Sequence, residues 1–271
     1  MKVHNSVLEI SHNYNGFILD IWGVLHSSGV PFEGVIENLL KLKKQQKQIV
    51  LLSNAPRRAS TVEAFLKEKV GIKIGKHYDA ILTSGEAFYL EMEAKKESGE
   101  VFYIGPEKDL DVTKGLLINL TKDLTSKPKF AIITGVVENS LEILHFLKQN
   151  HLTLYCLNPD IFITKSDGSR EDCAGMIAKK YLEIGGKVVY FGKPYINIYN
   201  QVMTFFERTE KSKILAIGDG METDIEGASK AGISSALCLA GLPSLELKSG
   251  IKIEDFIANF QYKPTFIINS L

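Results

Sequence analysis

The sequence has no apolar run that approaches the ~20 residues needed to cross a bilayer. Its first sixteen residues also lack the apolar stretch of a secretory signal peptide. Cysteine is scarce, with three in 271 residues, and the widely spaced, odd number argues against a disulfide framework or a cysteine metal cluster. We therefore expect a cytoplasmic protein that keeps its thiols reduced and has no membrane part.

Charge of one sign is not in excess either, because 32 basic side chains are matched by 32 acidic ones. The sequence has no excess of basic residues of the kind that predicts nucleic-acid binding. It also has no basic amphipathic stretch of the kind that predicts binding to a membrane surface. The sequence also lacks a G-x-G-x-x-G motif after its first apolar run, which argues against a dinucleotide-binding protein. A small molecule is the expected partner.

Short apolar runs alternate with segments of helical periodicity along most of the chain. Val62, Phe65, Leu66 and Val70 form one such helical stripe. This alternation predicts an α/β fold, with a mainly parallel, doubly wound sheet. Turn-rich breaks near residues 83 and 185 predict an inserted second domain. The runs lie at residues 16–22, 48–54, 78–84, 101–105, 129–135, 152–158, 187–192, 213–220 and 234–241.

Four of these runs end in side chains that can bind a phosphoryl group or a cation. An open parallel sheet binds its ligands outside the carboxyl ends of the strands, so these positions are the candidate site. Alone, an Asp or Ser at a strand end is more often a turn or helix cap, and a lone Lys is more often solvated. Asp219 interrupts an apolar strand at its tip, and carboxylates of this kind suit Mg²⁺. The residues are Asp20, Ser53 with Asn54, Lys193, and Asp219 with Asp224.

The joint order of these residues is far more specific than any one of them. The segments that carry it are DIWGVL (20–25), LLSNAPR (51–57), FGKPYINIY (191–199) and IGDGMETDIEGASKAG (217–232). Together they resemble the haloacid dehalogenase superfamily, and more narrowly its class IIA branch of sugar and nucleotide phosphatases. The resemblance implies a Rossmann-like core at residues 1–82 plus 186–271, with an α/β cap inserted at residues 83–185.

The resemblance also implies a mechanism. Asp20 would be the nucleophile and form an aspartyl-phosphate, which water then hydrolyses. Mg²⁺ would bind Asp20, Asp219 and the backbone carbonyl of Trp22, and Asp224 would hold metal-bound water or orient Lys193. Substrate contacts would come from Ser53, Asn54, Arg57 and Lys193, with Ser53 and Lys193 gripping the phosphoryl oxygens. A homodimer through the cap is expected by analogy alone.

One position departs from the pattern. Most phosphatases of this superfamily carry a second Asp two residues after the nucleophile, where this sequence has Trp22. That Asp protonates the leaving group, a contribution typically worth about 10²–10⁴ in rate. His26 is a candidate substitute acid, although a solvated loop histidine is the favoured interpretation. Two hypotheses follow: a Mg²⁺-dependent phosphatase of a small phosphorylated metabolite, or a module that binds Mg²⁺ and phosphate but turns over slowly or not at all.

Overall fold

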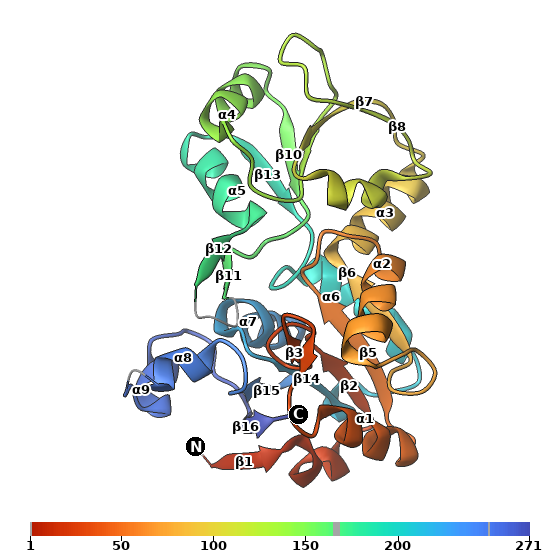
Figure 1. The fold of residues 1–271 in the computed structure, drawn as a ribbon, viewed down its shortest axis with the longest axis vertical. Coiled ribbons are helices and arrows are strands. Elements are labelled where there is room, and N and C mark those ends of the chain that lie inside the picture. Colours follow the sequence, from red (N-terminus) through yellow and green to blue (C-terminus); the bar gives the residue numbers. More distant parts are fainter. Residues whose placement is uncertain (1, 165–168, 249) are drawn as a thin grey trace.

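The computed structural model describes residues 2–164, 169–248 and 250–271, and it contains two parallel sheets (Figure 1). The larger sheet lies in the lower half of the figure and has the order β1-β16-β15-β14-β2-β5-β6. Its strands are β1 (Val3–Ser6), β2 (Gly16–Leu19), β5 (Gln48–Ser53), β6 (Ala80–Thr83), β14 (Ile214–Gly218), β15 (Ser234–Cys238) and β16 (Phe266–Ser270). Each neighbouring pair is parallel, as the sequence predicts.

The smaller sheet lies in the upper half and is also parallel throughout, in the order β13-β10-β9-β7-β8. Its strands are β7 (Ser98–Ile104), β8 (Leu117–Thr121), β9 (Ala131–Ile133), β10 (Thr153–Cys156) and β13 (Lys187–Tyr190). Two short antiparallel hairpins complete the strands: β3 (His26–Ser27) with β4 (Val30–Pro31), and β11 (Phe162–Thr164) with β12 (Arg170–Asp172).

Both faces of the larger sheet are buried, because successive side chains of its central strands point to opposite sides. In β2, Phe17 and Leu19 pack with helices α1 and α2, whereas Ile18 packs with α6 and α7 on the other face. The helices are α1 (Val35–Lys44), α2 (Ala59–Phe65), α3 (Ser84–Lys95), α4 (Ser140–Gln149), α5 (Ala174–Glu183), α6 (Ile196–Met203), α7 (Glu226–Ala231), α8 (Pro243–Lys248) and α9 (Ile253–Ala258).

One hydrophobic cluster is shared between the two sheets. It joins Val50 and Leu52 of the larger sheet to Val101 and Tyr103 of the smaller one, with Phe88 of α3 between them. Each fully buried side chain of this kind contributes about 1.5–3 kcal/mol. Apolar packing therefore joins the two sheets.

The nine apolar runs of the sequence all contain strands, and the helical stripe at residues 62–70 forms α2 and the π-helical turn Leu66–Val70 that continues it. The break at residues 83–85 is not a loop, because Thr83 caps α3 by accepting a hydrogen bond from the Glu86 amide (2.9 Å). Residues 187–190 form β13, which pairs with β10 in the smaller sheet. Among the described residues, no helix combines the length and apolar character that crossing a membrane requires.

Candidate active site

Three neighbouring strands bring the predicted residues to one edge of the larger sheet. Strand β2 lies between β14 and β5. Asp219 directly follows β14, Asp20 directly follows β2, and Ser53 is the last residue of β5. The Asp20 amide still donates to the Ile217 carbonyl (2.9 Å), so the parallel pairing continues up to Asp20. The fold therefore places all three at the carboxyl edge, as the sequence predicts.

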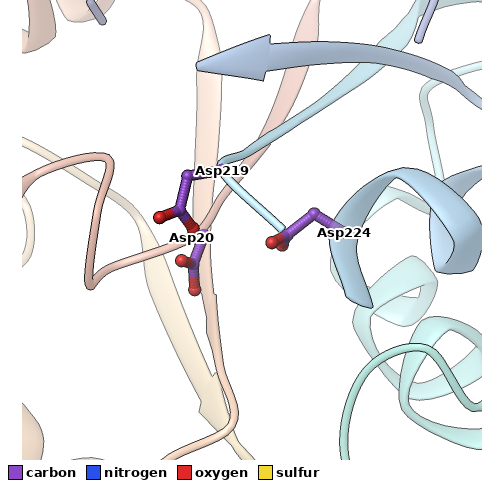
Figure 2. Close-up of side chains that lie close together, drawn as sticks. All are labelled: Asp20, Asp219 and Asp224. Carbon is purple, nitrogen blue, oxygen red and sulfur yellow. The ribbon is translucent and has the colours of Figure 1, made fainter. Parts of the chain in front are cut away.

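Three carboxylates converge at this edge (Figure 2). Asp20 and Asp219 come from adjacent strand ends, and Asp224 faces them from the π-helical turn Met221–Ile225. One oxygen from each of the three lies within 4.8 Å of the others. All three side chains are buried.

Backbone groups fix two of these carboxylates. The Leu242 amide donates to Oδ2 of Asp219 at 2.7 Å, and the Gly220 amide donates to Oδ2 of Asp224 at 3.2 Å. Gly23 and Gly241 pack so closely on Asp219 that a Cβ at either would lie 2.0 Å from its Oδ2. The sequence motifs did not include Leu242, because a backbone donor leaves no side-chain signature.

Lys193 is the positive charge of the site. Its Nζ donates to Oδ1 of Asp20 (2.5 Å) and to Oδ1 of Asp224 (2.7 Å), and the residue is 3 % exposed. Burial lowers the pKa of Lys193, but the two carboxylates raise it more, to well above its ordinary value. The ammonium form is therefore favoured near neutral pH, and it is held beside Asp20.

The negative charge at this edge is only partly balanced. Burial raises the pKa of Asp20 well above its ordinary value against the opposing effect of Lys193, and repulsion by Asp224 and Asp219 adds to the rise. Burial and repulsion by Asp224 raise the pKa of Asp219 to about 7. Among the described residues of this cluster, three carboxylates face one ammonium group. A divalent cation with oxygen ligands fits this surplus of buried negative charge.

All the candidate residues line a single cavity of about 1210 Å³. Ser53 accepts a hydrogen bond from the Ala55 amide (3.2 Å). Arg57 lies in this cavity wall, but its Nε is 3.6 Å from Oδ1 of Asp109 in the 3₁₀ helix Glu107–Thr113. Its guanidinium therefore forms an ion pair with Asp109, and a contact with substrate stays a prediction. The Trp22 carbonyl as a metal ligand also stays a prediction.

His26 is not the solvated loop residue that the sequence favoured. It is 2 % exposed and its ring packs between Trp22 (5.4 Å between centroids) and Phe65 (5.5 Å). Nδ1 accepts a hydrogen bond from the Gly29 amide at 3.3 Å. Burial lowers the pKa of His26 to about 4, so the ring is neutral near pH 7 and poorly suited to protonating a leaving group.

This burial predicts an acid-sensitive fold. Because the folded-state pKa lies below that of the unfolded chain, the unfolded state takes up the proton first as the pH falls. Protonation of this group should lower the free energy of unfolding of the native protein by on the order of 2 kcal/mol between about pH 7.5 and about pH 5. It should have no effect on that free energy at higher pH. Urea unfolding at the two pH values measures the loss. In His26→Gln, which keeps an acceptor for Gly29 but does not titrate, the pH-dependent difference should shrink by that amount; an unchanged difference would refute the assignment.

The fold and the site define an α/β protein with a strand-tip aspartate, a buried lysine and a carboxylate pair suited to a cation. Two family models agree with this. A haloacid dehalogenase-like hydrolase model matches residues 17–118, and a second, HAD-hydrolase-like model matches residues 190–271. Together they take in well over half of the sequence. The chain belongs to the haloacid dehalogenase-like hydrolases.

Known proteins resemble the chain over almost its whole length. The ribonucleotide monophosphatase NagD of Escherichia coli K12 is 24 % identical, with 94 % of this chain and 95 % of that protein covered. A haloacid dehalogenase-like hydrolase from Brucella suis 1330 superposes with a TM-score of 0.85 at 25 % identity, covering 99 % of this chain and 100 % of that one. A glycerol phosphate phosphatase from Mycobacterium tuberculosis, solved with calcium, shares the fold (TM-score 0.71, 20 % identity, 95 % and 74 % covered).

Proposed function

We propose that the protein is a Mg²⁺-dependent phosphatase of a small phosphorylated metabolite and that Asp20 is its nucleophile. The observation that carries the proposal is the buried ion-pair cluster in which Lys193 bonds both Asp20 and Asp224 beside Asp219. The relative from Escherichia coli is named a monophosphatase, and a structure of the same fold holds a divalent cation, which support the reaction class and the metal site.

The residues divide the chemistry among them. A carboxylate oxygen of Asp20 forms a bond to phosphorus while the bond to the ester oxygen breaks, and the leaving group departs with that electron pair. Lys193 and the Ser53 hydroxyl hold phosphoryl oxygens and stabilise the charge that develops on them. Water then attacks the phosphorus of the aspartyl-phosphate and restores Asp20. A cation held by Asp20 and Asp219, with Asp224 beside it, would supply charge neutralisation and orientation.

The insertion is proposed to act as a cap over this site. Its residues Asp109, Asn158 and Asp160 line the same cavity as Asp20. Because β13 pairs in the smaller sheet, we place the second boundary of the insertion after residue 190 rather than after residue 185. A cap in this position would exclude water and complete the substrate pocket.

The alternative, a module that binds Mg²⁺ and phosphate without efficient turnover, is favoured by one specific observation. Trp22 stands where an acid is expected, and the buried His26 is neutral near pH 7. Neither side chain can therefore protonate a leaving group at that pH. The two functions share the metal site and differ in whether phosphate is released.

The metal site itself is tested by Asp219→Ala. We expect Mg²⁺ affinity to fall by at least about 10–100-fold, a loss typical even of groups that only support a ligand. Calorimetric titration of Mg²⁺ into the two proteins measures the change. Asp172→Ala is the matched control, because Asp172 is an exposed carboxylate on the same cavity. Equal affinity of Asp219→Ala and the natural protein would refute the metal assignment.

A further inference from the structure

The Asn54 side chain holds the backbone of Lys193 from two sides. Its Oδ1 accepts a hydrogen bond from the Lys193 amide at 2.7 Å, and its Nδ2 donates to the Lys193 carbonyl at 3.1 Å. Asn54 is 5 % exposed, and it follows the strand that ends at Ser53. The larger sheet thus fixes the main chain from which the Lys193 ammonium reaches Asp20.

A residue of the insertion binds the same carboxamide. Nδ2 of Asn54 also donates to Oδ1 of Asp160, at 2.8 Å. Asp160 lies in the loop after β10, and that loop is itself fixed: the Asp160 amide donates to the Asn158 side chain (3.2 Å), and the Asp160 carbonyl accepts from the Gly175 amide (3.1 Å). The loop after β10 therefore presents the Asp160 carboxylate to Asn54 from a position that is fixed by two hydrogen bonds.

Gly192 shows how tightly these segments meet. A Cβ at this position would lie 2.6 Å from Oδ1 of Asn54 and 2.9 Å from Cδ of Pro159, the residue before Asp160. Gly192 also has a positive φ of 122°, which other residues rarely adopt. Because Gly192 has no side chain, the segment that carries Lys193 can pack against both Asn54 and the loop that carries Asp160.

We propose that Asp160 is a positioning residue, which orients the Asn54 carboxamide and thereby places Lys193 between Asp20 and Asp224. This inference rests on the proposed function. A carboxamide can be turned by 180°, which would set its NH₂ group against the Lys193 amide, where two donors would meet. A carboxylate offers only acceptors, so Asp160 adds to the preference that the Lys193 backbone already sets: Oδ1 accepts from the Lys193 amide, and Nδ2 donates to the Lys193 carbonyl and to Asp160. Placement of the phosphate-binding lysine thus depends on contact with the cap.

A second role for Asp160 has to be separated from this one. Burial raises the pKa of Asp160, and the hydrogen bond from Asn54 opposes the rise. A carboxyl group of this kind, in a cavity whose usual acid is replaced by Trp22, is also a candidate proton donor. The two roles differ in what they need. Positioning needs an acceptor for Nδ2, which an amide supplies as well as a carboxylate does, whereas proton donation needs the acid.

The experiment compares Asp160→Ala and Asp160→Asn with p-nitrophenyl phosphate and glycerol phosphate as probes. Misplacement of a catalytic group by about 1 Å can cost 10²-fold, so we expect Asp160→Ala to lower kcat/KM by about 10–100-fold on both probes. Asp160→Asn should stay within about threefold of the natural protein, because its carbonyl still accepts from Asn54. Asp160→Leu is a second variant without an acceptor should the alanine variant fail to fold. Glu183→Ala, which removes an exposed carboxylate of α5 that does not line the cavity, is the matched control and should change nothing.

The pairing with Asn54 is tested separately. In an Asn54→Ala background, Asp160→Ala should have no further effect on kcat/KM or on the affinity for inorganic phosphate in the presence of Mg²⁺. Equal damage by Asp160→Asn and Asp160→Ala would overturn the proposal in favour of an acid, and additive effects of the two alanine changes would overturn it as well. Phosphate affinity can be measured without turnover. A protein that binds phosphate but hydrolyses neither probe would therefore contradict the proposed function. The phosphate affinities of the single and double variants of Asn54 and Asp160 would then still decide the role of Asp160. A protein that binds no phosphate would overturn both.

Discussion

Asp20→Asn is expected to lower kcat on p-nitrophenyl phosphate by on the order of 10⁴–10⁶-fold, the scale seen when the nucleophile of a covalent mechanism is removed. The carboxamide has the shape of the carboxylate and can still accept the hydrogen bond that Lys193 donates to Oδ1. It lacks the negative charge that attacks phosphorus. The loss should therefore fall on the chemical step, and it is measured by the initial rate of nitrophenolate release in Mg²⁺.

The same substitution should also abolish trapping of the site by beryllium fluoride, a mimic of the phosphorylated aspartate. Tight, Mg²⁺-dependent binding of the mimic to the natural protein and none to Asp20→Asn would locate the covalent intermediate. Thermal melting of the two proteins controls for folding. Full phosphatase activity in Asp20→Asn would place the nucleophile elsewhere.

The second large effect concerns the leaving group. Trp22 lines the cavity beside Asp20 and its ring contacts the buried His26, so neither position supplies a proton near pH 7. The aryloxide group of an aryl phosphate leaves readily as an anion, whereas the alkoxide group of an alkyl phosphate needs protonation before it can leave. We therefore expect kcat/KM for aryl phosphates to exceed that for alkyl phosphates by about 10²–10⁴-fold, the usual contribution of a general acid.

Trp22→Asp should narrow this gap by raising alkyl activity, because it restores a carboxyl group two residues after Asp20. Rates on p-nitrophenyl phosphate and glycerol phosphate for both proteins measure the gap. Trp22→Phe is the control for loss of the indole, and it should leave the gap wide. Equal rates of the natural protein on both substrates would show that another acid is present; His26→Ala and Asp160→Asn would then identify it.

Much of the candidate site could be predicted from local sequence patterns. Asp20, Ser53 and Asp219 could be predicted to meet because each ends an apolar run, and parallel strands share one carboxyl edge. The strands themselves follow from the same runs. Strand β1 (Val3–Ser6) has no apolar run and is formed by pairing with β16 at the edge of the sheet, so its local sequence gives no signal.

Other features depend on segments that are distant in the chain. A local pattern predicts that residues 187–190 form a strand, but it does not specify which of the two sheets the strand joins. The burial of His26 depends on Phe65 of α2, and the orientation of Asn54 depends on Asp160, 106 residues away. Asp219 is held by the amide of Leu242, a backbone contact that any residue except proline could make. Such features follow from tertiary packing and could not be read from residue spacing.

The most direct test of the central claim is release of inorganic phosphate from p-nitrophenyl phosphate by the natural protein, measured with Mg²⁺ and with the metal removed by a chelator. A phosphatase that uses the carboxylate cluster should release phosphate over many turnovers with Mg²⁺, and release should stop on chelation and resume when Mg²⁺ is restored. Absence of release in both conditions, while calorimetry still detects binding of Mg²⁺ and phosphate, would contradict the proposed function and leave a binding module.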